Sequence, residues 1–97
     1  MIYQDFRASL SFDKPPAGLP VLVAALWHLE KDDWHAAHEI AQVIESREAA
    51  WVHAHLHRVE GDIWNADYWY RKAGKTRPEV SLEDERTAIV KALLGVT

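Results

Sequence analysis

A weak internal repeat constrains the fold of this 97-residue chain more than any other feature. Residues 30–36 (EKDDWHA) return thirty residues later, at 60–66, as EGDIWNA, and the same offset matches Ala24 with Ala54. A period of this length is typical of stacked helical hairpins, in which one helix-turn-helix unit is used twice. The repeat therefore predicts an all-α protein built from paired helices.

Capping residues divide the chain into five expected helices. The candidate N-caps are Asp32 or Asp33, Ser46, Asp62 and Ser81, residue types whose side-chain oxygen accepts a bond from the first free amides of a helix. Glycine follows three of the apolar segments and favours the left-handed residue that ends a helix. The expected helices span residues 19–30, 33–45, 47–60, 63–73 and 82–94.

We expect one domain over residues 1–97. Residues 1–18 are predicted to form a non-helical arm, because a Pro-Pro pair near its end fixes the backbone and removes two donors. Two antiparallel hairpins follow, at 19–46 and 47–78. Residues 81–94 are predicted to form a C-terminal capping helix, since a repeat array needs a cap at its end.

The second hairpin resembles a tetratricopeptide repeat (TPR). Ala66, Tyr70, Ala73 and Pro78 match the second-helix pattern of that family, which is alanine, an aromatic residue four later, a small residue and a closing proline. The period here is four residues short of the usual 34, so helix lengths or packing between repeats must differ. The segment DWHAAHE at 33–39 is also similar to a group of short uncharacterised bacterial proteins. The TPR resemblance implies a groove for a protein or peptide.

Composition excludes several classes of partner. The net charge is −4 and no block of Lys or Arg could follow a phosphate backbone, so nucleic acid is not an expected partner. The absence of cysteine excludes disulfide and thiol chemistry. No apolar run approaches the roughly 20 residues of a membrane span, and the first residues do not resemble a signal peptide. We therefore expect a cytoplasmic protein that does not bind membranes.

Histidines are the main candidates for chemistry. His53 and His57 lie four residues apart, so on a helix they share one face and can aim two nitrogen ligands at one metal ion. A neighbouring helix could complete the shell with His38, Glu39 or Asp67. No H-E-x-x-H motif is present, however, and no cofactor or metal is expected from the sequence. His38, His53 and His57 are the candidate ligands if a metal does bind.

A buried polar network is the competing interpretation, and the one that the sequence favours. In the TPR register His53 and His57 face the partner helix, where a buried imidazole needs hydrogen-bond partners. Tyr68, Tyr70 and Asp67 on the next helix are the candidate partners. The expected helix at 47–60 also carries an apolar stripe, Val52, Leu56 and Val59. If that stripe makes the main core contact instead, His53 and His57 turn toward the edge of the groove. The sequence leaves both orientations open.

Three further residues are candidates for binding. Arg58 and Glu60 lie near the second hairpin turn with Asp62, and we expect Arg58 to form an internal salt bridge there, with anion binding as the alternative. Trp51 has no aromatic counterpart in the first repeat and could line a binding surface, although core packing is the commoner role.

The sequence thus leaves two functions from different classes. The favoured one is a non-catalytic helical-repeat module that binds a protein, a peptide or a second copy of itself as a homodimer. The alternative is a small-molecule or metal-binding protein, or an enzyme, that uses His38, His53, His57, Arg58 and Glu60. No catalytic residue is predicted, and the balance is against an enzyme. Convergence of these side chains on one accessible pocket would favour the alternative, whereas side chains that are buried and bonded to one another would favour the repeat module.

Overall fold

A computed structural model describes residues 1–95, and over those residues the chain is helical with no strand. The helices are α1 (Tyr3–Ser9), α2 (Val21–Glu30), α3 (Trp34–Gln42), α4 (Arg47–Glu60), α5 (Ile63–Lys72) and α6 (Leu82–Leu94). The predicted all-α class is confirmed, and each of the five expected helices is present with ends shifted by three residues at most. Within the described part of the chain, every helix is too short or too polar to cross a membrane.

The four predicted N-caps explain why these boundaries could be read from the sequence. Each capping side chain accepts a hydrogen bond from the amide three residues on. The pairs are Asp33 with Ala36, Ser46 with Ala49, Asp62 with Asn65 and Ser81 with Asp84. Gly61 has a φ of 87° and ends α4 in the left-handed conformation that glycine tolerates best.

The prediction of a non-helical arm over residues 1–18 is wrong for its first part, which forms α1. A helix this short is not stable by itself, and tertiary contacts hold it. Phe6 is 1% exposed and belongs to the main core. The indole nitrogen of Trp27 on α2 donates a hydrogen bond of 3.1 Å to the hydroxyl of Ser9. These contacts join segments distant in sequence, so local pattern alone does not reveal them.

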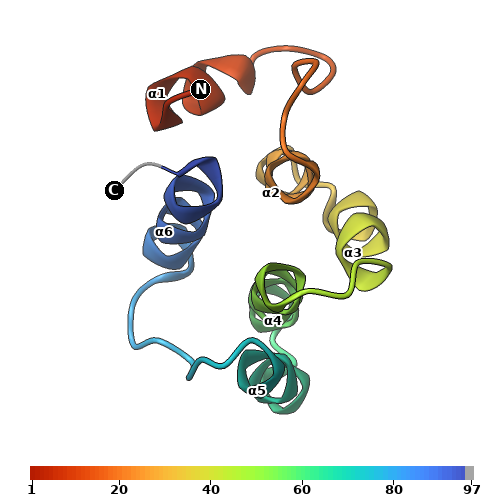
Figure 1. Ribbon diagram of the computed structural model, residues 1–97, viewed down its shortest axis with the longest axis vertical. Coiled ribbons are helices and arrows are strands. Elements are labelled where there is room, and N and C mark those ends of the chain that lie inside the picture. Colours follow the sequence, from red (N-terminus) through yellow and green to blue (C-terminus); the bar gives the residue numbers. More distant parts are fainter. Residues whose placement is uncertain (96–97) are drawn as a thin grey trace.

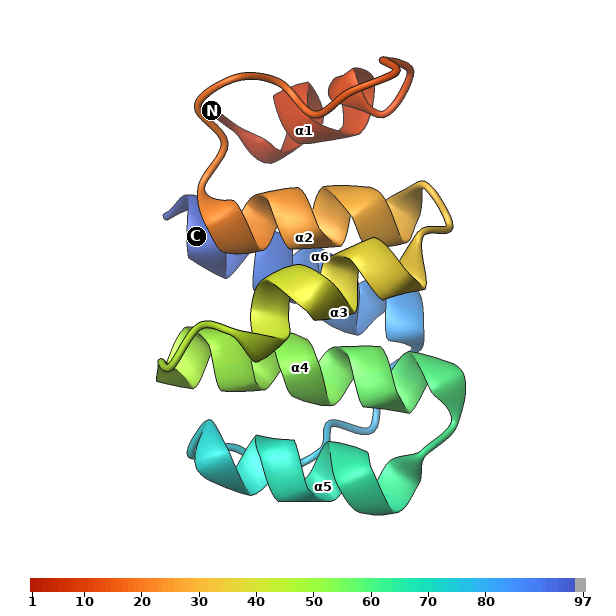
Figure 2. The ribbon, with the colours of Figure 1, turned by 90° about the vertical axis from the view of Figure 1, so that its right-hand side faces the viewer.

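The helices from α2 to α5 pack in chain order, each on the next, as layers of one stack (Figure 2). The last helix does not extend this stack. Instead α6 turns back and packs on α2 and α4, the first helices of the two hairpins, with α1 beside it (Figure 1). Ile89 and Val90 of α6 are buried in the main core between them. The predicted capping helix therefore covers the inner face of both hairpins.

Helix α4 is the centre of the molecule. It packs against α2, α3, α5 and α6, and its side chains from Ala49 to His57 are buried except for the half-buried Trp51. Val52 and Leu56 enter the main core, whereas Ala54 joins a smaller cluster with Ala66 and Tyr70 of α5. A helix enclosed in this way places its polar side chains inside the protein as well, so they must find partners there.

A buried carboxylate joins α4, α5 and α6. Glu85 of α6 is 3% exposed, and its Oε1 lies 2.6 Å from Nδ1 of His55 and 3.0 Å from Nη1 of Arg58. The hydroxyl of Tyr70 donates to its other oxygen, and Nε of Arg86 donates to Nε2 of His55 at 3.1 Å. Burial by itself would raise the pKa of Glu85, but hydrogen bonds from His55, Tyr70 and Arg58 outweigh it and lower the pKa below its ordinary value.

Replacing this carboxylate should destabilise the fold strongly. We expect Glu85→Ala to lower the free energy of unfolding by about 3–5 kcal/mol, because the half-buried Arg58 loses its counter-ion and the buried His55 loses its hydrogen-bond partner. Urea denaturation followed by circular dichroism at pH 7 measures the loss. Glu83→Ala is the matched control, since Glu83 is exposed on the same helix and should cost less than about 1 kcal/mol. Equal small losses for both variants would contradict the structural role of Glu85.

Candidate functional site

Three histidines converge between α3 and α4. His38 of α3 and His53 and His57 of α4 each place one ring nitrogen so that the three nitrogens lie within 4.8 Å of one another. The Nε2 atoms of His38 and His53 are 3.0 Å apart. The i and i+4 positions on α4 present two imidazoles on one face, and the neighbouring helix supplies the third. Three of the predicted site residues therefore form one cluster.

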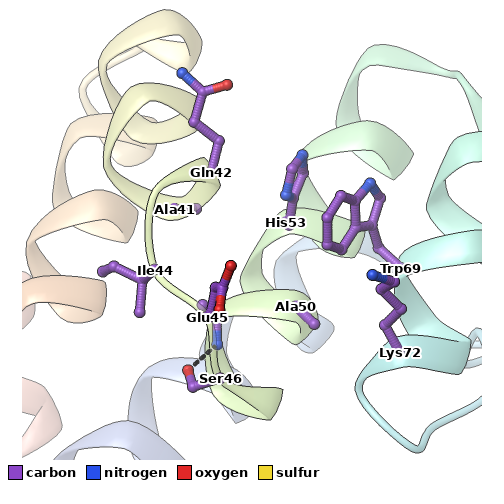
Figure 3. Close-up of a pocket in the computed structure, with 10 residues that line it drawn as sticks. Ala41, Gln42, Ile44, Glu45, Ser46, Ala50, His53, Trp69 and Lys72 are labelled. Carbon is purple, nitrogen blue, oxygen red and sulfur yellow. Dashed lines mark hydrogen bonds between the residues drawn. The ribbon is translucent and has the colours of Figure 1, made fainter.

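Tryptophan rings hold two of these imidazoles in place. The ring of His53 stacks on Trp69 of α5, with centroids 3.9 Å apart and planes inclined by 16°. The ring of His38 stacks on Trp34 at 4.8 Å and 11°. Figure 3 shows His53 and Trp69 side by side at the edge of a cavity. Stacking on both sides of the cluster restricts ring rotation and so fixes the directions of the nitrogen lone pairs.

Glu60 orients the third imidazole. Its Oε1 lies 2.6 Å from Nδ1 of His57, one turn earlier on the same helix. A carboxylate at Nδ1 holds the proton on that nitrogen and leaves the lone pair on Nε2. Within residues 1–95 no hydrogen bond reaches that Nε2. His57 therefore has the tautomer, with the proton on Nδ1 and a free lone pair on Nε2, in which proteins present imidazole to a metal ion.

Two of the three imidazoles have lowered pKa values. Burial, reinforced by the neighbouring His38 and His57, lowers the pKa of His53 to about 4. Burial followed by the proximity of His57 also lowers the pKa of His38. Metal ions bind the neutral form of imidazole, so these shifts favour ligation and disfavour proton uptake.

A cavity of about 430 Å³ adjoins the cluster between the end of α3, the start of α4 and α5. Gln42, Glu45, Trp69 and Lys72 line it together with His53 (Figure 3). His53 is the one member of the predicted site that lines this cavity within the described residues. His53 and His57 are 6% and 8% exposed, so the cluster is largely closed, and His53 is its contact with the cavity.

Arg58 and Glu60 act separately. Arg58 forms an internal salt bridge, as expected, but its partner is Glu85 and not Glu60 or Asp62, and it also donates to the carbonyl of Val80. The arginine therefore belongs to the buried network on the side of α6. Glu60 contacts His57 and so remains part of the histidine site.

Trp51 lies apart from the histidines. The ammonium of Lys75 sits 4.2 Å from the centre of its ring, and the ring lines a separate cavity beside Pro78 and Ala88. The contact orders a half-buried indole on the surface shared by α4, the loop after α5 and α6. Trp51 therefore does not contribute to the same site as His53.

The hydrogen-bond partners predicted for the histidines were wrong. Tyr70 donates to Glu85, and Asp67 accepts from Arg77 at 2.9 Å. The cluster is instead bonded within itself and to Glu60. The sequence reasoning also missed His55, which is fully buried against Glu85. Each of the two orientations expected for this helix buries one face and leaves the other exposed. Burial of the middle of α4 on every side would have indicated His55, and neither orientation includes it.

No family model matches the chain, and no curated protein or solved structure matches it either. The tetratricopeptide resemblance therefore stays a prediction. The fold and the site define the chain by themselves as a small all-α protein with a largely buried cluster of three histidines.

The low pKa of His53 makes stability depend on pH in a defined window. In the unfolded chain His53 takes up a proton near pH 6.5, whereas the folded protein resists protonation until about pH 4. Stability should therefore fall as the pH is lowered from 6.5 to 4, by about 2 kcal/mol at pH 5. Urea denaturation of chelator-treated protein at pH 7 and pH 5 measures this change.

The matched variants are His53→Gln and His35→Gln. His53→Gln should lose most of the pH-dependent decrease, whereas His35→Gln, whose side chain is 81% exposed, should keep it. An equal decrease in the wild type and His53→Gln would show that His53 does not cause it.

Proposed function

We propose that this chain is a metal-binding protein that holds one divalent first-row transition ion through His38, His53 and His57. The convergence of three ring nitrogens, two of them on imidazoles with lowered pKa values, is the observation that supports it. Three imidazole ligands with a fourth position left for water or another ligand suit Zn²⁺ and its neighbours in the first transition row.

The spacing of the nitrogens is close to what such an ion requires. Two ligands at 2.0–2.1 Å from zinc in tetrahedral geometry lie about 3.4 Å from each other. The Nε2 atoms of His38 and His53 are already 3.0 Å apart. The widest separation within the cluster is at most 4.8 Å, so it has to shorten by no more than about 1.4 Å on binding. Small shifts of the side chains can supply that movement while α3 and α4 stay packed against each other.

A purely structural polar core explains the cluster less well. The hydrogen bond between His38 and His53 would be enough for a polar contact between α3 and α4. The cluster nevertheless contains a third imidazole, His57, with its own carboxylate, Glu60. Burial disfavours the charged forms of His53 and His38, and neither of them has a carboxylate partner in exchange within the described residues. Clusters of titratable groups with strongly shifted pKa values are concentrated at functional sites.

The fold also gives less support to a peptide groove than to this site. In a TPR-like array the partner would lie along the first helices of the hairpins. Here α6 lies on α2 and α4, and its Ile89 and Val90 are buried there. An incoming peptide would have to displace a helix anchored through Glu85. Metal binding requires no such rearrangement.

Zinc titration of chelator-treated protein tests the proposal. Isothermal titration calorimetry should give one Zn²⁺ per chain, and saturation at 100 times Kd should stabilise the fold by about 2.7 kcal/mol. His38→Gln should abolish stoichiometric binding because it removes a ligand from a half-buried position without opening the core. Glu60→Gln should weaken binding by about 10–100-fold, because Glu60 orients His57.

His35→Gln is the control, since His35 is exposed on the same helix as His38 and pairs with Glu39. Its zinc affinity should equal that of the wild type. Absence of binding to folded wild-type protein would overturn the proposal. Binding lost in His35→Gln and kept in His38→Gln would place the ion on the surface instead.

A further inference from the structure

Two charged side chains of opposite sign line the cavity beside His53. Lys72 belongs to α5, and Glu45 belongs to the loop between α3 and α4, on a different wall (Figure 3). Within residues 1–95 neither of them forms a salt bridge. The ammonium of Lys72 lies 5.3 Å from the ring centre of Trp69 and 5.4 Å from that of Tyr68, so aromatic contacts hold it at its wall. A molecule in the cavity that carries both charges would pair with both walls.

The ring of His53 brings a third polar atom to this cavity. Its Nε2 lies 3.0 Å from Nε2 of His38, and its Nδ1 has no hydrogen-bond partner among the described residues. Every buried side-chain nitrogen or oxygen in that part of the chain does have a partner. The Nδ1 atom is therefore not sealed in the core, and the cavity is the open space that His53 lines.

A bound metal ion turns this nitrogen into a hydrogen-bond donor. When Nε2 of a neutral imidazole binds a metal ion, the ring proton lies on Nδ1. Ligating histidines almost always donate that proton to a carboxylate, a carbonyl or water. Glu60 has this role for His57, whereas residues 1–95 place no such acceptor at Nδ1 of His53. The acceptor for His53 therefore has to come from the contents of the cavity.

These groups and the cavity wall fit a free amino acid. Nδ1 of His53 and the ammonium of Lys72 are donors for a carboxylate, and Glu45 is an acceptor for an ammonium group. An α-amino acid carries a carboxylate and an ammonium group on one carbon atom. The cavity of about 430 Å³ is in the size range of small-molecule sites. Its wall also has apolar parts that suit an apolar side chain, from Ala41, Ile44, Ala49, Ala50 and Trp69.

We propose that this cavity binds a free amino acid with an apolar side chain, whose carboxylate is held by His53 and Lys72 and whose ammonium group is held by Glu45. In the metal-free chain the bond between His38 and His53 needs a proton on one of the two Nε2 atoms, so Nδ1 of His53 is protonated in only part of the molecules. Metal binding fixes that proton on Nδ1, so the ion and the amino acid should bind cooperatively. This cooperativity rests on the proposed metal site, whereas the contacts of Lys72 and Glu45 do not.

Calorimetric titration with L-leucine tests the amino-acid site in chelator-treated and in zinc-loaded protein. L-Leucine should bind once per chain, and about 10-fold more tightly when zinc is bound. Isocaproate is leucine without its ammonium group, and isoamylamine is leucine without its carboxylate. Each should bind at least about 10-fold more weakly than L-leucine, because one wall of the cavity loses its partner. Equal affinities for L-leucine and isocaproate would overturn the role of Glu45.

Variants of the two charged walls separate this site from the metal site. Lys72→Met and Glu45→Gln should each weaken L-leucine binding about 10-fold and leave zinc binding, measured without leucine, unchanged. The matched controls are Lys75→Met and Glu48→Gln, since these exposed residues line a different cavity. Both controls should bind L-leucine as the wild type does.

The outcomes distinguish the two proposals. Zinc binding without any L-leucine binding overturns the amino-acid site and leaves the metal site in place. L-Leucine binding that depends on Lys72 and Glu45 in a chain that takes up no zinc supports the amino-acid site and overturns the metal site. If zinc-loaded Lys72→Met and Glu45→Gln bind L-leucine as tightly as the wild type, the ion alone holds the ligand, and the amino-acid site is overturned.

Discussion

The enclosure of α4 by four other helices is the constraint on which the rest of the structure depends. A helix buried on one side can direct its polar side chains to water, but the middle of α4, residues 49–57, cannot, because α2, α3, α5 and α6 surround it. His53, His55 and His57 are consequently all inside the protein. Each must be bonded there, and the chain satisfies them in two separate clusters on different sides of the same helix.

The two clusters differ in how completely they are satisfied. Glu85 accepts hydrogen bonds from His55, Arg58 and Tyr70, so its charge is neutralised and its role is to join α6 to α4 and α5. The other cluster contains imidazoles held by one mutual hydrogen bond and by Glu60. A ligand would gain little at Glu85 and much among the histidines. This contrast is why function is assigned to the second cluster and stability to the first.

Local signals in the sequence predicted the starts of helices and the residues that share a helix face. Features that depend on contacts between distant segments could not be predicted in this way. The N-caps at Asp33, Ser46, Asp62 and Ser81 fixed helix starts, and the spacing of His53 and His57 placed both on one face. The short α1 depends on tertiary contacts to Phe6 and Ser9, so no local pattern revealed it. The partners of Arg58 and His55 are about thirty residues away on α6. Their identity follows from where α6 packs, which the repeat does not specify.

The most direct measurement of the central claim is a crystal structure of the zinc-loaded chain with anomalous differences collected at the zinc absorption edge. Metal binding at the cluster predicts one strong peak per chain, about 2.0–2.1 Å from one ring nitrogen each of His38, His53 and His57. A peak on the exposed pair of His35 and Glu39, with the buried histidines still bonded to each other, would contradict it. So would a structure without any peak near the cluster.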